Sequence, residues 1–138
     1  MVDRALLADR IAAIRDATAR IRSVLPPTVS AFVHDRTTRE VVVLNMFVAI
    51  QTAVDLATHW LADAGWDVPT TYGELFTSLA DHGVLERPLA SRLAAASGLR
   101  NLIAHQYGVI NATRIYEIAT TDLADLDSFC AALAARAQ

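Results

Sequence analysis

The chain of 138 residues contains no lysine, a single cysteine, five glycines and four prolines. Because Cys130 has no second cysteine to pair with, an internal disulfide and a metal site built from several cysteines are both excluded. Charged residues are also scarce, at 20% of the chain, which excludes a solvated, disordered segment. The net charge of −3 argues against a broad basic surface that binds nucleic acid.

Two kinds of targeting or membrane segment are also missing. Residues Val2 to Asp9 lack the basic and then apolar pattern of a signal peptide, so we expect a cytoplasmic protein. The most apolar stretch, Val41 to Ile50, has about half the length that a bilayer crossing needs, and it contains Asn45. We therefore expect this stretch to be a buried helix, and we expect no membrane partner.

What the sequence has in abundance is alanine, the residue with the highest helix propensity, at 26 positions. Apolar residues recur at helical spacing and predict four main helices, which span about Asp3 to Val24, Thr37 to Ala64, Pro88 to His105 and Asp122 to Ala135. A shorter helix is expected between Thr71 and Gly83. The fold class is therefore all-α: an up-and-down bundle of four main helices plus short helices, in a single domain of residues 1–138.

Local patterns predict where two of these helices begin and one ends. Thr37 and Glu40 match a capping box, in which the threonine accepts from a backbone amide and the glutamate returns to the amide of the threonine. Thr71 and Glu74 repeat the pattern at the shorter helix. Gly65 fits the position just after the second main helix, where a left-handed residue ends it.

Polar residues gather where the helix from Pro88 ends, at residues 100–107, with the sequence RNLIAHQY. Side chains four residues apart on a helix share a face, so Asn101 can contact His105. Metal-free RNA cleavage needs proton carriers and a cation for the phosphorane, and histidine and Arg100 are suited to these tasks. One chain offers one such histidine, so a symmetric dimer would supply both proton carriers.

Each of these observations also has a structural interpretation without catalysis. Arginine, asparagine, histidine and tyrosine at a helix end are often capping and surface residues. Gln51, Asp55 and His59 share one helical stripe, which either lines the same cleft, with Asp55 holding an arginine, or forms a solvated face. The four histidines show no ligand spacing, so we expect no metal site.

Residues 100–107 resemble the R-x4-H-x-Y motif of the HepT family, within the HEPN ribonuclease superfamily. Residues 49–59 are similar to the second-helix pattern of that family, and residues 69–76 to its following loop and helix. Gly98 and Leu99 precede the motif as they do in the family, and about residues 4–133 fit the resemblance.

The resemblance implies a HEPN-like helical homodimer that acts as a metal-independent endoribonuclease toxin, with a composite active site at a dimer interface through the second and fourth helices. It implies Arg100 and His105 as the catalytic pair, with Asn101 and Asp55 as supporting residues. Cleavage of the RNA substrate would need no cofactor. The same fold could instead serve as a noncatalytic nucleotide- or partner-binding module, in which Arg100 holds a phosphate.

The resemblance also implies a partner, an MNT-type nucleotidyltransferase antitoxin. This partner would use ATP and Mg²⁺ to attach AMP to the tyrosine of the motif, Tyr107. An AMP group there would place an anion beside Arg100 and compete with RNA phosphate. Many relatives have an acidic residue between the histidine and the tyrosine, whereas this chain has Gln106.

Overall fold

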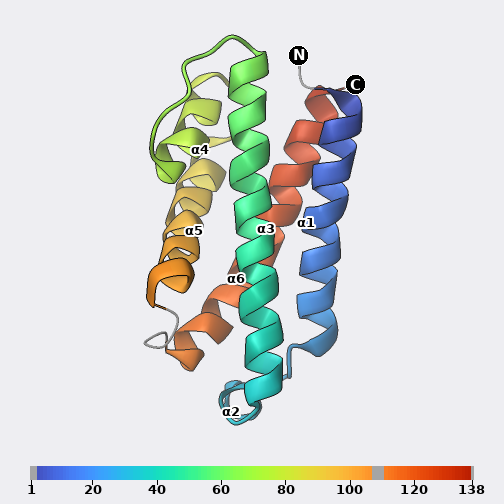
Figure 1. Ribbon diagram of the computed structural model, residues 1–138, viewed down its shortest axis with the longest axis vertical. Coiled ribbons are helices and arrows are strands. Elements are labelled where there is room, and N and C mark those ends of the chain that lie inside the picture. Colours follow the sequence, from blue (N-terminus) through green and yellow to red (C-terminus); the bar gives the residue numbers. More distant parts are fainter. Residues whose placement is uncertain (1–2, 107–110, 138) are drawn as a thin grey trace.

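The structure, a computed structural model, describes residues 3–106 and 111–137, without the side chains of residues 102 and 104–106. It contains the helices α1 (Arg4–Val24), α2 (Val29–Val33), α3 (Arg36–Asp63), α4 (Tyr72–Asp81), α5 (Arg87–Gln106) and α6 (Ala112–Arg136). The described residues contain no strand. Figure 1 shows the four long helices α1, α3, α5 and α6 running up and down the bundle, as the sequence predicts. The prediction of an all-α fold is confirmed.

Helix α3 lies at the centre of this bundle and contacts the five other helices. By length and composition it is long and apolar enough to cross a membrane, but half of its most apolar window is buried inside the molecule. The side chains of Met46 and Leu56 are fully buried. This is the position of a core helix, which is what the sequence predicts for Val41 to Ile50.

The predicted start of α3 is wrong by two residues. The N-cap is Asp35, whose carboxylate accepts from the Thr38 amide at 3.1 Å and from the Thr38 hydroxyl at 2.8 Å. Those hydrogen bonds, the one from the backbone first, lower the pKa of Asp35. Glu40 forms an ion pair with Arg36 at 2.8 Å. A carboxylate at position 35 therefore replaces the threonine cap that the sequence pattern predicts at Thr37.

Three other helix ends lie where the sequence predicts them. Thr71 is the N-cap of α4, and its hydroxyl accepts from the Glu74 amide at 3.4 Å. Gly65 follows α3 with a φ of 76°, in the left-handed region that glycine adopts without steric cost. Asp3 caps α1, since its carboxylate accepts from the Ala5 amide at 2.7 Å.

Helix α6 begins ten residues earlier than predicted, at Ala112, with Asn111 as its N-cap. Residues 112–121 contain threonine and isoleucine, whose helix propensity is low, so the sequence pattern does not predict a helix there. Tertiary contacts compensate for that propensity: Ile115 and Ala119, one turn apart, are buried. The Tyr116 hydroxyl also donates to the Pro26 carbonyl at 2.7 Å, which ties this segment to the turn after α1.

Two buried apolar clusters fill the bundle. The first joins α1, α3, α4, α5 and α6, and Phe76 meets Phe129 edge to face within it at 5.7 Å. The second joins α1, α2, α3, α5 and α6, and it contains Leu99 and Ile103. Because these two residues anchor the last turns of α5, they fix the direction in which the neighbouring Arg100 points.

Candidate active site

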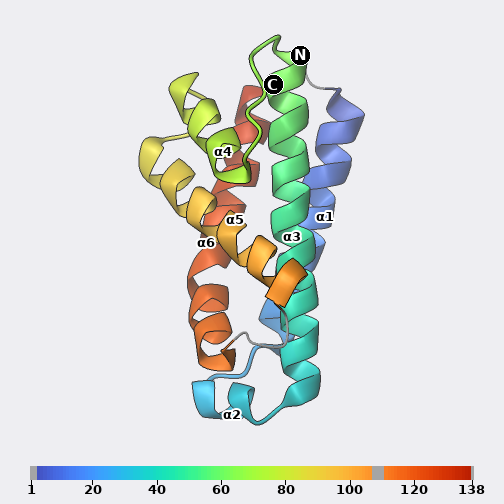
Figure 2. The same cartoon turned by 60° about the vertical axis from the view of Figure 1, so that its left-hand side comes forward.

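Arg100 lies near the carboxyl end of α5, where that helix crosses the middle of α3 (Figure 2). Its half-buried side chain makes two hydrogen bonds. The Nε donates to Oε1 of Gln51 on α3, and Nη1 donates to Oδ1 of the neighbouring Asn101 at 3.1 Å. The guanidinium is therefore held from its own helix and from the central helix of the bundle.

Two aromatic rings complete the surroundings of Arg100. Its Cζ atom lies 5.0 Å from the ring centroid of Phe47 on α3 and 5.2 Å from that of Tyr72 on α4. Both distances are within the range of a cation–π interaction. Phe47 and Gln51 are one helical turn apart, so α3 presents a ring and an amide to the same guanidinium. Three helices thus meet at Arg100.

The partners of Arg100 differ in charge from those of most other arginines. Six arginines in the described chain form ion pairs with carboxylates: Arg10, Arg22, Arg36, Arg87, Arg92 and Arg114. The four partners of Arg100 are two amides and two aromatic rings, and no described carboxylate forms an ion pair with it. A positive charge that is fixed in place without a counter-ion is suited to bind an anion.

The structure brings together some of the predicted site residues. Asn101 is exposed and in contact with Arg100. His105 follows one turn later on α5, and its side chain lies outside the part that the structure describes. Tyr107 lies outside the described residues altogether. The geometry at this end of α5 is therefore known for Arg100 and Asn101.

The sequence leaves two interpretations of Asp55 open, and in the structure its side chain contacts α1 and His59. Its carboxylate accepts from Nε of Arg10 on α1 at 2.9 Å and lies 3.8 Å from Nε2 of His59. It holds an arginine, but that arginine is not Arg100. Gln51, one turn earlier on α3, faces the end of α5 and makes the contact instead. Asp55 points toward α1 because Arg10 reaches it from that side.

Sequence reasoning missed the aromatic part of the site. Neither Phe47 nor Tyr72 is among the site residues that the sequence predicts. The one signal in the sequence was the spacing of Phe47 and Gln51, which places them on the same face. Tyr72 carries no such signal, because it reaches Arg100 from another helix, 28 residues away along the chain.

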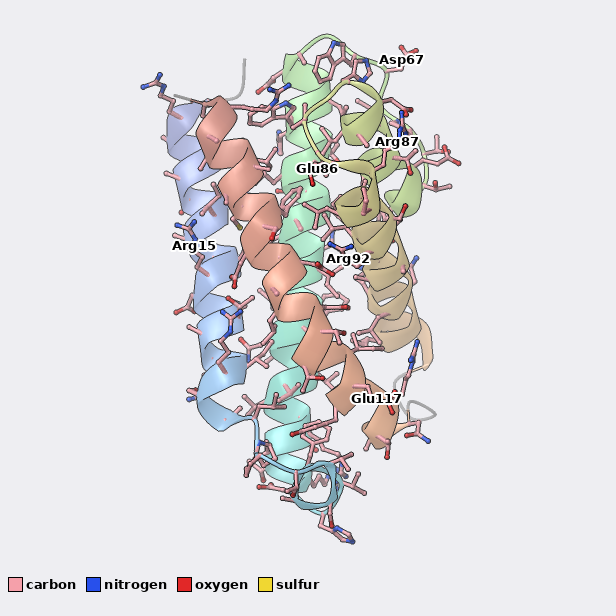
Figure 3. All side chains as sticks on the ribbon, turned by 180° about the vertical axis from the view of Figure 1, so that it is seen from behind. Arg15, Asp67, Glu86, Arg87, Arg92 and Glu117 are labelled. Carbon is pink, nitrogen blue, oxygen red and sulfur yellow. The ribbon has the colours of Figure 1, made fainter. Side chains whose placement is uncertain are left out.

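Arg100 does not line either of two grooves found among the described residues. A groove of about 360 Å³ runs between α5 and α6, and it is lined by Arg92, Ala95, Ala96, Leu99, Arg114, Glu117, Ile118, Thr121 and Asp122. Figure 3 labels Arg92 and Glu117, which lie along this groove. Arg92 pairs with Asp125 at 2.9 Å, and Arg114 with Glu117 at 3.6 Å, so its cations are neutralised.

The second groove, of about 510 Å³, lies between α1 and α6, and its lining consists of four alanines, Leu7, Ile11 and the two arginines Arg4 and Arg15. Among the described residues, no group of three histidine, cysteine, aspartate or glutamate side chains could hold a metal ion. Arg100 differs from the arginines that line these grooves because two neutral amides and two aromatic rings hold its guanidinium in place.

Comparison with known proteins identifies the class to which this helical bundle belongs. The family described as "Ribonuclease HepT-like" matches residues 14–133. The match covers most of the chain and includes α3, α4 and α5, which form the surroundings of Arg100. The chain therefore belongs to the HepT-like ribonuclease family.

Individual relatives agree with this assignment. The mRNA nuclease HepT of Shewanella oneidensis is 27% identical over 124 residues, which cover 90% of this chain and 92% of that protein. The solved structure of a tri-AMPylated Shewanella oneidensis HEPN toxin in complex with MNT antitoxin is similar, with a TM-score of 0.88 and 26% identity over 96% of this chain and 99% of that chain. The fold is therefore HEPN-like, as predicted.

A protein of lower sequence identity has a similar fold. The cytosolic Bacillus subtilis protein YutE, of unknown function, has a TM-score of 0.86 at 14% identity, over 98% of this chain and 90% of that chain. At this identity the likeness concerns the arrangement of the helices alone.

Proposed function

We propose that this chain is a metal-independent endoribonuclease toxin whose active site is completed by a second copy of the chain. The observation that carries the proposal is the fixed and unneutralised guanidinium of Arg100, five residues before His105 on the same helix. Membership of the HepT-like ribonuclease family supports it. In the cytoplasm such a protein would meet both RNA and the ATP that its partner uses.

The proposed reaction is a transesterification within the RNA backbone. The 2′-oxygen attacks the adjacent phosphorus, and the bond from phosphorus to the 5′-oxygen breaks. His105 of one chain takes the proton of the 2′-hydroxyl, and His105 of the other gives a proton to the leaving 5′-oxygen. Arg100 binds the phosphate oxygens and stabilises the negative charge that grows on them in the transition state, with Asn101 as a supporting residue.

Two exposed surfaces support a dimer through α3 and α5. On α3, Leu44 is 62% exposed and Val48, one turn later, is 38% exposed, on the side of the helix that also carries Gln51. On α5, Ala95 and Gly98 are exposed, and such small side chains allow a second helix to approach closely. Association through these surfaces would bury apolar area and bring two copies of the motif together.

We also propose that an MNT-type nucleotidyltransferase antitoxin neutralises the toxin by adding AMP to Tyr107, with ATP and Mg²⁺ as its own requirements. The similar toxin from Shewanella oneidensis is described as tri-AMPylated and in complex with MNT antitoxin. Tyr107 comes seven residues after Arg100, so the phosphate of the AMP group would compete with RNA for the same cation.

The nuclease proposal is tested by incubating RNA with the purified chain, with and without EDTA, beside the variants His105→Ala and Arg100→Ala. We expect cleavage by the wild type in EDTA and loss of at least a hundredfold in both variants, the usual size of an acid–base or charge-stabilising contribution. Equal cleavage by wild type and His105→Ala would refute the proposed mechanism. Stabilisation by AMP or ATP without any RNA loss would favour the noncatalytic binding module.

The antitoxin proposal has a separate test. The chain is co-expressed with an MNT-type nucleotidyltransferase antitoxin, and the intact mass of the chain is measured. We expect a mass increase by one or more AMP units, together with loss of RNA cleavage. Tyr107→Phe should prevent the increase and keep the cleavage. An unchanged mass increase in Tyr107→Phe would show that another residue accepts the nucleotide.

A further inference from the structure

Gln51 and Asp55 provide an internal comparison, because each receives the Nε donor of an arginine from a different neighbouring helix. The two residues lie one turn apart on α3. Gln51 accepts from Nε of Arg100, and Asp55 accepts from Nε of Arg10 at 2.9 Å. The acceptor in the first pair is a neutral amide, and in the second it is a carboxylate. The same helix therefore fixes two arginines and neutralises only one of them.

The electrostatic consequence is visible at Arg10. The hydrogen bond that Arg10 donates to Asp55 is the largest cause that raises the pKa of Arg10, and the charges of Asp55 and Asp9 raise it further. These carboxylates surround Arg10 with negative charge and leave little attraction for a further anion. Arg100 has no such neighbour among its described partners.

Some N–H donors of Arg100 are used within the chain, and the others remain available to bind a phosphate. A guanidinium has five N–H donors. The Nε–H is used by Gln51 and one N–H of Nη1 by Asn101, which leaves the two on Nη2 and one on Nη1 without a partner in the described chain. The aromatic rings of Phe47 and Tyr72 lie close to the guanidinium and restrict its position further. Two neighbouring nitrogen atoms thus keep donors for bidentate binding of an anion.

We infer that Gln51 is a positioning residue for Arg100: its amide fixes the guanidinium through Nε, and its lack of charge keeps the full positive charge available to the scissile phosphate. This inference rests on the proposed function for the identity of the anion. A glutamate at position 51 would have the same length and could accept the same hydrogen bond, but it would neutralise the cation. A leucine would leave the charge but remove the acceptor.

The two substitutions therefore predict different kinetic defects. Gln51→Glu should raise KM for RNA about tenfold and also lower kcat, because the added carboxylate competes with the phosphate for Arg100 both in the bound substrate and in the transition state. Gln51→Leu should lower kcat about tenfold with little change in KM, because a cation that is still present is no longer held in the productive position. The control is Ala19→Glu, which adds the same charge at an exposed position of α1, a helix that packs on α3 and α6. It should cleave like the wild type.

A second measurement does not depend on cleavage. In a ¹⁵N-labelled sample, the Nε–H signal of Arg100, assigned by its loss in Arg100→Lys, should exchange slowly with water in wild type and Gln51→Glu. It should exchange rapidly in Gln51→Leu. Inorganic phosphate should shift this signal in wild type and Ala19→Glu, and about tenfold more phosphate should be needed in Gln51→Glu.

The outcomes separate the inference from the proposed function. An unchanged Nε–H signal in Gln51→Leu, or equal phosphate binding by wild type and Gln51→Glu, would overturn the role of Gln51 even if the wild type cleaves RNA. The expected NMR results in a wild-type chain that does not cleave RNA would support the positioning role while refuting the nuclease proposal.

Discussion

Gly98 is expected to reduce the stability of the single chain, and its replacement by alanine is the most informative substitution outside the candidate site. It lies in the interior of α5, it is exposed, and a Cβ added to it would meet no atom within 4 Å. Glycine in a helix interior costs about 0.8–1.0 kcal/mol relative to alanine. Gly98→Ala should therefore stabilise the folded chain by nearly this amount, since no steric penalty opposes the gain.

The expected shift in melting temperature follows from the length of the chain. Unfolding entropy is about 2.1 cal/mol/K per residue, so 138 residues give roughly 290 cal/mol/K. A gain of about 1 kcal/mol then raises Tm by about 3 °C. Ala95→Gly, at another exposed position of the same helix, is the matched control and should lower Tm by a similar amount.

Two quantities have to be measured, the stability of the single chain and the strength of the dimer, because the proposed dimer interface includes the face of α5 that carries Gly98. Thermal unfolding is measured at a protein concentration at which sedimentation shows single chains, and the dimer dissociation constant is measured separately. We expect Gly98→Ala to raise Tm of the single chain and to weaken the dimer about tenfold, because an added methyl group keeps the second helix at a distance. A lower Tm would refute the argument from helix propensity. An unchanged dimer would show that this face of α5 is outside the interface.

Three further predictions concern single side chains. Asp35→Ala should lower Tm, whereas Thr37→Ala should leave Tm nearly unchanged, because the Asp35 carboxylate is the cap of α3. The pKa of Asp35 is lowered in the folded chain, so its stabilising effect is lost as the carboxylate is protonated. In urea unfolding, the difference in stability between wild type and Asp35→Ala should therefore disappear as the pH falls below about 4. Burial raises the pKa of Asp122, so the folded state binds the proton more tightly, and Asp122→Asn should raise Tm at pH 7 by an amount that vanishes as the pH falls through the raised pKa. Burial raises the pKa of the Cys130 thiol to about 11, so a thiol reagent at pH 8 should label Cys130 in urea but not in the folded chain. Equal labelling in both conditions would contradict that burial.

Much of the fold follows from local sequence patterns. The spacing of apolar residues, together with the few glycines and prolines, predicts the four long helices, and the cap at Thr71 and the left-handed Gly65 are where the local pattern indicates. These features depend on residues within one or two helical turns, so the sequence contains the information directly. The first ten residues of α6 were not predicted, because their helix depends on the burial of Ile115 and Ala119 against the rest of the bundle.

Some features of the candidate site also follow from the local sequence, and others follow from the tertiary structure alone. The sequence by itself determined that Arg100, Asn101 and His105 follow one another on a single helix. The resemblance to the HepT family came from this motif together with the segments at residues 49–59 and 69–76 that precede it. Only the tertiary structure decided that Gln51, Phe47 and Tyr72 surround Arg100 and that Asp55 holds Arg10. The physical reason is the register between helices. The contact between Arg100 and Gln51 spans 49 residues, and one turn of displacement along α3 would replace a neutral amide by a carboxylate.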